Sequence, residues 1–234
     1  MLSAASKFYQ RSLSYASSKV EDMDIKKIFE ELINRGADAM AQANDGKTPL
    51  HYAVRASSHV YVELLLDNGA GPIQPDSNGD TALHHFVQTT YKWNEALFKR
   101  FLEAGVDINT RNDRGETPLF KFIQVGNERL CGSPGEKTYK TPTFNFFEDS
   151  GADIFVRNND GSTLLHILAG IAPKMLHLGN GLISTSVGVR RFKRLMESGL
   201  DPMAEDGMQR TSVDVAAACG NEHVLKLFER KPME

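Results

Sequence analysis

A short phrase that recurs along the chain constrains the fold more than any other feature of the sequence. Each full copy places a threonine two residues after a glycine and a leucine two residues after that threonine. The intervals between successive motif threonines are 33, 36, 46 and 48 residues. Self-similarity at such a spacing is typical of a solenoid, in which small units stack on their neighbours. The copies are Gly46–His51, Gly79–His84, Gly115–Phe120, Gly161–His166 and, in reduced form, Thr211–Asp214.

A second phrase, which reads glycine, any residue and usually aspartate, precedes each copy of the first. Its third residue lies ten residues before the motif threonine in all five copies, and we call this connector the finger. The finger tip is rich in Asp, Asn and Gly, which predicts a hairpin, because glycine adopts positive φ without the steric cost of a β-carbon. The copies of this phrase are Gly36–Asp38, Gly69–Gly71, Gly105–Asp107, Gly151–Asp153 and Gly199–Asp201.

Apolar residues after each motif threonine predict a pair of helices. In the first full repeat a short apolar segment contains Leu50 and Val54, and a longer one contains Leu65 and ends at Gly69. Threonine is a favourable residue for capping the start of a helix, and glycine can end a helix in the left-handed conformation. A lone pair of such helices cannot bury its apolar face, so neighbouring pairs must stack.

These phrases resemble the ankyrin-repeat family, whose T-P-L-H-x-A signature recurs about every 33 residues. The resemblance covers residues 22–230, with 1–21 as an N-terminal tail or polar cap and 231–234 as a C-terminal tail. It implies an all-α ankyrin-repeat solenoid with short β-hairpin fingers, made of about five repeats and an N-terminal helix. The repeat signature then consists of Thr48, His51, Thr81, His84, Thr117, Thr163, His166 and Thr211.

The resemblance also implies a function, since ankyrin relatives bind partner proteins with their finger tips and with the exposed face of each first helix. The signature histidines are then structural residues that hydrogen-bond between fingers. We therefore expect a non-catalytic scaffold or adaptor, or alternatively the regulatory or inhibitory portion of a larger assembly. The expected contact residues are Tyr52, Arg55, His85, Gln88, Lys121, Gln124 and Ile167 in the groove, Lys47, Asp80, Glu116 and Ser162 at the finger tips, and Trp93 in a loop.

Two insertions distinguish this chain from a regular array. Because the finger length is constant, the extra residues of the third and fourth repeats, 125–142 and 170–188, lie between the two helices of a repeat. Equivalent loops of a solenoid are neighbours, so Leu176, Leu178, Leu182 and Ile183 either pack against Leu130 and Tyr139 or cover their own repeat. The last finger has Gln209 where the others have glycine, and we expect it to be distorted.

No catalytic, cofactor or metal site emerges from the sequence. The seven histidines are spread along the array, and His84 and His85 point to different helix faces. Cys131 and Cys219 are too few for a disulfide scaffold or a four-thiolate zinc site. We expect no small-molecule substrate and no enzymatic activity, since the array leaves no length for a catalytic domain.

Charge and hydropathy point to an intracellular protein. The net charge of −3 gives no field that attracts nucleic acid or anionic membranes, and no apolar run approaches the roughly 20 residues that span a bilayer. A basic cluster at residues 190–194 is compatible with nuclear import or binding of a polyanion, or with a solvated helix face, with Phe192 inward and the charges outward. Residues 1–20 are compatible with a mitochondrial transit peptide, a frayed tail or a polar capping helix. We expect a cytoplasmic protein, with the nucleus as an alternative.

Overall fold

The computed structural model describes residues 22–56, 58–88, 95–124, 142–171 and 185–229, and all of these residues are in helices, turns or irregular segments. The chain divides into two compact units, Met1–Asp113 and Arg114–Glu234, which we describe separately. Within the described residues, no helix is both long and apolar enough to cross a membrane.

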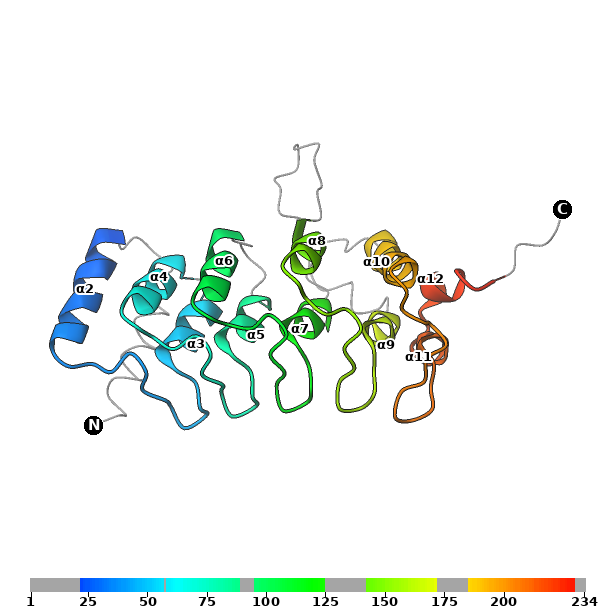
Figure 1. Ribbon diagram of the computed structural model, residues 1–234, viewed down its shortest axis with the longest axis horizontal. Helices are drawn as coiled ribbons and strands as arrows, with labels where there is room; N and C mark the ends of the chain where they lie inside the picture. Colours follow the sequence, from blue (N-terminus) through cyan, green and yellow to red (C-terminus); the bar gives the residue numbers. More distant parts are fainter. Residues whose placement is uncertain (1–21, 57, 89–94, 125–141, 172–184, 230–234) are drawn as a thin grey trace. The chain divides into compact units, whose positions relative to one another are not determined.

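The first unit contains an N-terminal helix and two helix pairs in two layers (Figure 1). Its first helices, α3 and α5, pack against each other, and α2 packs against the second helix α4. The pair α5 and α6 is joined by an aromatic contact, since the rings of Phe86 and Phe101 lie 5.5 Å apart. The helices are α2 (Asp22–Asn34), α3 (Pro49–Arg55), α4 (His59–Asp67), α5 (Ala82–Phe86) and α6 (Glu95–Glu103).

The second unit repeats this layering with three helix pairs (Figure 1). The first helix α9 packs against the first helices α7 and α11, while α10 and α12 pack together as second helices. Arg194 of α10 forms an ion pair with Glu148 of α8 in the layer of second helices. The helices are α7 (Pro118–Gln124), α8 (Pro142–Asp149), α9 (Leu164–Gly170), α10 (Thr185–Glu197), α11 (Ser212–Cys219) and α12 (Glu222–Leu225).

The predicted helix ends are confirmed. Thr48, Thr81, Thr163 and Thr211 have extended backbone and cap α3, α5, α9 and α11. Glycine follows the second helices in the left-handed conformation, as at Gly69, whose φ is +81°. The apolar faces between these ends form the core, in which Leu50 and Leu65 are fully buried.

The expected β-hairpin fingers are not confirmed, because none of their described residues forms a strand, and each finger contains a tight turn. In the finger at 76–80, Asp76 N–H donates to Asp80 O at 2.9 Å, and Gly79 N–H donates back to Asp76 O at 2.9 Å. A backbone hydrogen bond of 3.1 Å, from Asp113 N to Asn78 O, joins this finger to the next, and the side chain of Asn112 donates to Asp80 Oδ1 at 2.7 Å. These contacts do not form a strand ladder.

Close stacking explains why the finger tips need glycine. A β-carbon on Gly79 would lie 2.6 Å from Asp113 N, and one on Gly161 would lie 2.9 Å from Gly207 N. Both glycines also have positive φ, of 75° and 73°. Gln209 occupies the same place in the last finger with φ of 58°. No further finger follows it within the described residues, and Gln209 is exposed.

The expectation that the last finger is distorted is wrong. Asp206 N donates to Arg210 O at 2.9 Å and Gln209 N donates to Asp206 O at 3.0 Å, and equivalent bonds close the fingers at 43–47, 76–80 and 158–162. Asp206 holds this geometry, because its Oδ1 atom accepts hydrogen bonds from Met208 N at 2.8 Å and from Arg210 N at 3.0 Å.

The two insertions lie between the helices of a pair, as predicted, since they separate α7 from α8 and α9 from α10. The proposed contact of Leu176, Leu178, Leu182 and Ile183 with Leu130 and Tyr139 falls outside the described residues. So do residues 1–20, Cys131 and Trp93. The other cysteine, Cys219, is an exposed free thiol at the end of α11.

Candidate partner-binding surface

The signature histidines join one repeat to the next, as the resemblance implied. The Nδ1 atom of His51 accepts from Thr48 N at 3.1 Å, and Thr48 Oγ1 lies 2.9 Å from the same atom. Because a backbone N–H can only donate, the ring proton is on Nε2, which lies 3.1 Å from the carbonyl oxygen of Asp80 in the following finger. Burial lowers the pKa of His51 to about 4, which keeps this neutral tautomer in place.

The same geometry recurs in the second unit. Thr163 N donates to His166 Nδ1 at 3.2 Å, and His166 Nε2 lies 2.9 Å from Arg210 O in the next finger. Two repeats depart from it. Phe120 replaces the histidine in the third repeat, and the buried hydroxyl of Thr117 has no hydrogen-bond partner among the described residues. Asp214 replaces it in the last repeat and accepts from Thr211 N at 2.9 Å.

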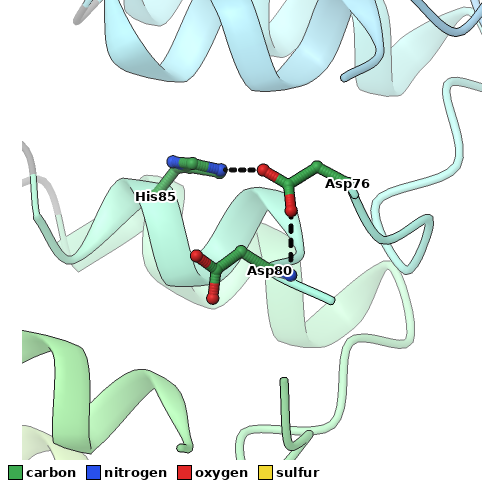
Figure 2. Close-up of side chains that lie close together, drawn as sticks. All are labelled: Asp76, Asp80 and His85. Carbon is green, nitrogen blue, oxygen red and sulfur yellow. Dashed lines mark hydrogen bonds and ion pairs between the residues drawn. The ribbon is translucent and has the colours of Figure 1, made fainter. Parts of the chain in front are cut away.

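A charged cluster lies between the fingers and first helices of unit 1 (Figure 2). His85 donates from Nε2 to Oδ2 of Asp76 at 2.9 Å, and the ammonium of Lys47 lies 3.6 Å from the same oxygen. The other oxygen accepts from Asn78 N at 2.8 Å and from Asp80 N at 3.1 Å. Burial alone raises the pKa of Asp76, but the hydrogen bonds from His85 and the backbone outweigh it and hold the pKa below its ordinary value.

This cluster also brings together three side chains that could ligate a metal. Single ligand atoms of Asp76, Asp80 and His85 lie within 4.8 Å of one another, which sequence reasoning did not anticipate. Donors of the protein itself already satisfy these carboxylates, since Asp80 Oδ1 accepts from Asn112 Nδ2 at 2.7 Å and both oxygens of Asp76 accept hydrogen bonds. These three side chains are therefore better explained as a hydrogen-bonded link between the finger and the helix than as a metal site.

Sequence reasoning missed the residues that organise the fingers. Asp76 and Asn158 each accept backbone hydrogen bonds across their own finger, the latter from Asp160 N at 3.1 Å and Ser162 N at 2.9 Å. The signal was present in the sequence, because an Asp or Asn lies five residues before the motif threonine in four of the five copies. These side chains form the local Asx turns that short polar residues favour. The four residues are Asp76, Asn112, Asn158 and Asp206.

Several expected contact residues lie at the surface of the first helices. Tyr52 donates from its hydroxyl to Asp45 Oδ1 at 3.3 Å, and Lys47 holds the other oxygen of Asp45 at 2.8 Å. Burial raises the pKa of Tyr52, and the Asp45 carboxylate raises it further. Arg55 and Gln124 are exposed, while Lys47, Tyr52, His85, Gln88 and Ile167 are half-buried.

The expected exposure is wrong for four finger and helix residues. Glu116 and Lys121 form an ion pair of 3.2 Å in which each side chain is only 4% exposed. Asp80 and Ser162 are 5% and 9% exposed. Glu116 pairs with Lys121, and Asp80 accepts a hydrogen bond from Asn112 of the next finger, so these side chains brace the fold. The contact roles of the surface residues above stay predictions.

The basic cluster at 190–194 differs from the expectation at one residue, Arg191, whereas Arg190, Lys193 and Arg194 are exposed as predicted. Phe192 is fully buried, as predicted, but Arg191 is buried too, with its guanidinium 4.8 Å from the centre of the Phe122 ring. Arg194 pairs with Glu148 and lies 5.6 Å from the centre of the Phe144 ring. Cation–π contacts thus hold the guanidinium of Arg191 inside the second unit, so it is not available to bind a polyanion.

Comparison with known proteins agrees with this geometry. Residues 13–93 match the family model for ankyrin repeats in three copies. An ankyrin repeat protein of Rickettsia felis is 31% identical over 116 residues, which cover 47% of this chain and 51% of the relative. Ankyrin repeat and SOCS box protein 6 of Homo sapiens is 26% identical over 166 residues, which cover 69% of this chain and 37% of the relative.

A third relative, neurogenic locus notch homolog protein 4 of Homo sapiens, is 36% identical over 103 residues, 44% of this chain and 5% of its own length. The alignments thus span about half or less of each relative, so the activities of those whole proteins do not transfer to this chain. The recurring phrases, the shared capping geometry and the match of residues 13–93 together show that the chain contains ankyrin repeats.

Proposed function

We propose that this chain binds a partner protein through the surface of its first helices, without chemistry of its own. Ankyrin repeats are in general protein–protein interaction modules, and the observation that carries the proposal here is the arrangement around α3. Arg55 is exposed beside the half-buried Tyr52, and the hydroxyl of Tyr52 is tied to Asp45. Tyrosine and arginine are the residues that most often dominate binding energy in interfaces.

The surroundings of Tyr52 support binding by a preorganised surface. Lys47 pairs with Asp45 and lies near Asp76, and Asp76 in turn holds His85. A partner would therefore meet side chains that are already ordered, which reduces the conformational entropy lost on binding. His85 of α5 and Gln88, in the turn that follows α5, extend the same kind of surface to the next repeat.

The experiment has two stages. The intact chain is used to capture a partner from extract of its source, and the partner, once identified, is purified. Its affinity is then measured for wild type, for the double variant Tyr52→Ala/Arg55→Glu and for Arg35→Glu. The last is the matched control, because Arg35 is an exposed arginine of the same unit that lies in an ion pair within α2 and its turn.

The proposal predicts that the double variant weakens binding by at least tenfold, or about 1.4 kcal/mol, while Arg35→Glu changes it by less than twofold. Thermal unfolding of the single variant Arg55→Glu should agree with that of wild type, since Arg55 is exposed. The double variant also loses the half-buried Tyr52, so affinities are measured well below its melting temperature. Equal affinity of wild type and double variant would remove the α3 surface from consideration.

A second candidate is the regulatory portion of a larger assembly. It is favoured by the relatives, because the matched segment is 37% of the SOCS box relative and 5% of the notch relative. The name of the first places ankyrin repeats together with a SOCS box, a second module. The mass of the native complex, measured in extract, distinguishes this candidate from a free adaptor that associates only transiently.

A further inference from the structure

Exposed apolar side chains gather at one position of the repeat. Six large hydrophobic side chains are exposed among the described residues, and four of them occupy the same place, two residues after the end of the glycine-x-aspartate phrase. Isolated exposed apolar residues are common and need no explanation, but recurrence at one structural position does. We call these four the turn row, and they are Met40 (38% exposed), Ile73 (61%), Phe155 (59%) and Met203 (54%).

The turn itself fixes the direction of these side chains. The backbone N–H of Phe155 donates to Asp153 Oδ1, and that of Met203 donates to Asp201 Oδ1, both at 2.8 Å. The third repeat has Asn109 at this place, with the same 2.8 Å bond to Asp107. Because a polar residue fits the turn equally well, the fold does not require an apolar side chain there.

In the second unit the two members of the row lie on neighbouring turns. The Cζ atom of Phe155 is 3.8 Å from the position that a β-carbon on Gly199 would take. Gly199 begins the phrase that leads to Met203, so the Phe155 ring leans on the turn that carries Met203 and still remains more than half exposed. Phe155 and Met203 together form a small apolar surface, which we call the ledge, and this surface remains exposed to solvent.

The charges beside this ledge are mainly acidic. Asp153 and Asp201 are exposed, and Glu205, also exposed, follows Met203 by two residues. The cation there, Arg157, donates to Gly161 O at 2.8 Å and to Glu205 O at 2.7 Å. Carboxylates repel nucleic acid and anionic membranes and attract lysine and arginine.

We propose that Phe155 and Met203, with the carboxylates of Asp153 and Asp201, form a second docking surface for a protein segment that combines apolar side chains with lysine or arginine. This surface is separate from the first helices and does not depend on the proposed function of the α3 surface. It lies on the turns that follow the second helices α8 and α10.

The test uses display selection of random peptides against the intact chain. Peptides are counter-selected on the double variant Phe155→Asn/Met203→Asn, which copies the residue that Asn109 provides at the same turn. The surviving peptides are synthesised, and their dissociation constants are measured by fluorescence anisotropy. Met208→Asn is the matched control, because Met208 is 72% exposed in the same unit but lies on the finger, outside the turn row.

The proposal predicts peptides with apolar residues and net positive charge, whose dissociation constant rises at least tenfold in Phe155→Asn/Met203→Asn and less than twofold in Met208→Asn and Arg55→Glu. Asp153→Asn/Asp201→Asn should weaken them at least threefold, since asparagine keeps the turn bond and removes the charge. Failure to obtain a peptide that depends on Phe155 and Met203 overturns the proposal. So do dependent peptides without positive charge, or binding of wild type to anionic lipid vesicles that the double variant loses.

Discussion

The imidazole of His51 joins two repeats, because its Nε2 atom lies 3.1 Å from the carbonyl oxygen of Asp80, 29 residues further along the chain. On the other side of the ring, Nδ1 accepts the backbone N–H of Thr48. One side chain thus caps its own helix and holds the next finger. The stability of such an array is a sum of interfaces between neighbours, so this contact contributes directly to it.

Replacing His51 with alanine should therefore destabilise the protein strongly. The change removes both hydrogen bonds and leaves a cavity, since His51 is fully buried. We expect the free energy of unfolding to fall by about 2–4 kcal/mol, measured by urea denaturation. His223→Ala is the control, because His223 is exposed and its loss should change the free energy by less than about 0.5 kcal/mol. Similar effects of the two substitutions would contradict the bridging role.

Stability should depend on pH through the same residue. Burial lowers the pKa of His51 from 6.5 to about 4, so below pH 6.5 the unfolded chain binds a proton that the folded chain does not. Its contribution is complete above pH 6.5 and is lost progressively as the pH falls toward 4. We expect the free energy of unfolding to drop by about 2 kcal/mol between pH 7 and pH 5, and the drop to be much smaller in His51→Gln. Parallel pH profiles of the two proteins would show that another group titrates.

The motif threonines should respond differently to removal of the hydroxyl group. Thr48→Val and Thr163→Val lose the contact with a histidine and should each lower the free energy of unfolding by about 1 kcal/mol. Thr117→Val removes a buried hydroxyl that has no partner among the described residues. That substitution should leave stability unchanged or raise it by up to about 1 kcal/mol. Equal losses in all three variants, by chemical denaturation, would mean that Thr117 Oγ1 is satisfied in solution.

Two glycines of unit 1 offer a matched comparison of strain and crowding. Gly69 and Gly79 have φ of 81° and 75°, so alanine costs about 1–2 kcal/mol at either position. A β-carbon at Gly69 meets no atom within 4 Å, whereas one at Gly79 lies 2.6 Å from Asp113 N. Gly79→Ala should therefore cost a further 1–3 kcal/mol or so. A melting comparison in which both variants lose the same stability would contradict the close stacking of the fingers.

The features that the sequence predicted correctly have a local physical cause. The cap at Thr48 and the helix end at Gly69 follow from the conformations that these residue types favour, whatever surrounds them. The position of both insertions follows from the constant finger length. Burial was harder to predict, because it depends on neighbouring repeats. Lys121 lies in the expected groove helix, yet its ammonium turns inward to Glu116.

Most of the wrong predictions concerned the exposure of long polar side chains. Arg191 was expected on the outside of α10, but the aromatic rings of the preceding helix pair give its guanidinium a favourable inner position. The hairpin prediction is not confirmed, because the described finger residues form turns and no strand. Asp76, Asp80 and His85 meet through the turn of one finger, which a pattern of residue types along a helix does not reveal.

The most direct test of the central claim is a hydrogen-exchange footprint of the captured partner on the intact chain. Binding through the first helices predicts that backbone amides of residues 44–56 and 82–88 become protected when the partner is bound, while those of α2 and α4 do not. Tyr52→Ala/Arg55→Glu should abolish this protection at the same partner concentration. Protection of α2 and α4 in the absence of any change at α3 would contradict binding through the first-helix surface.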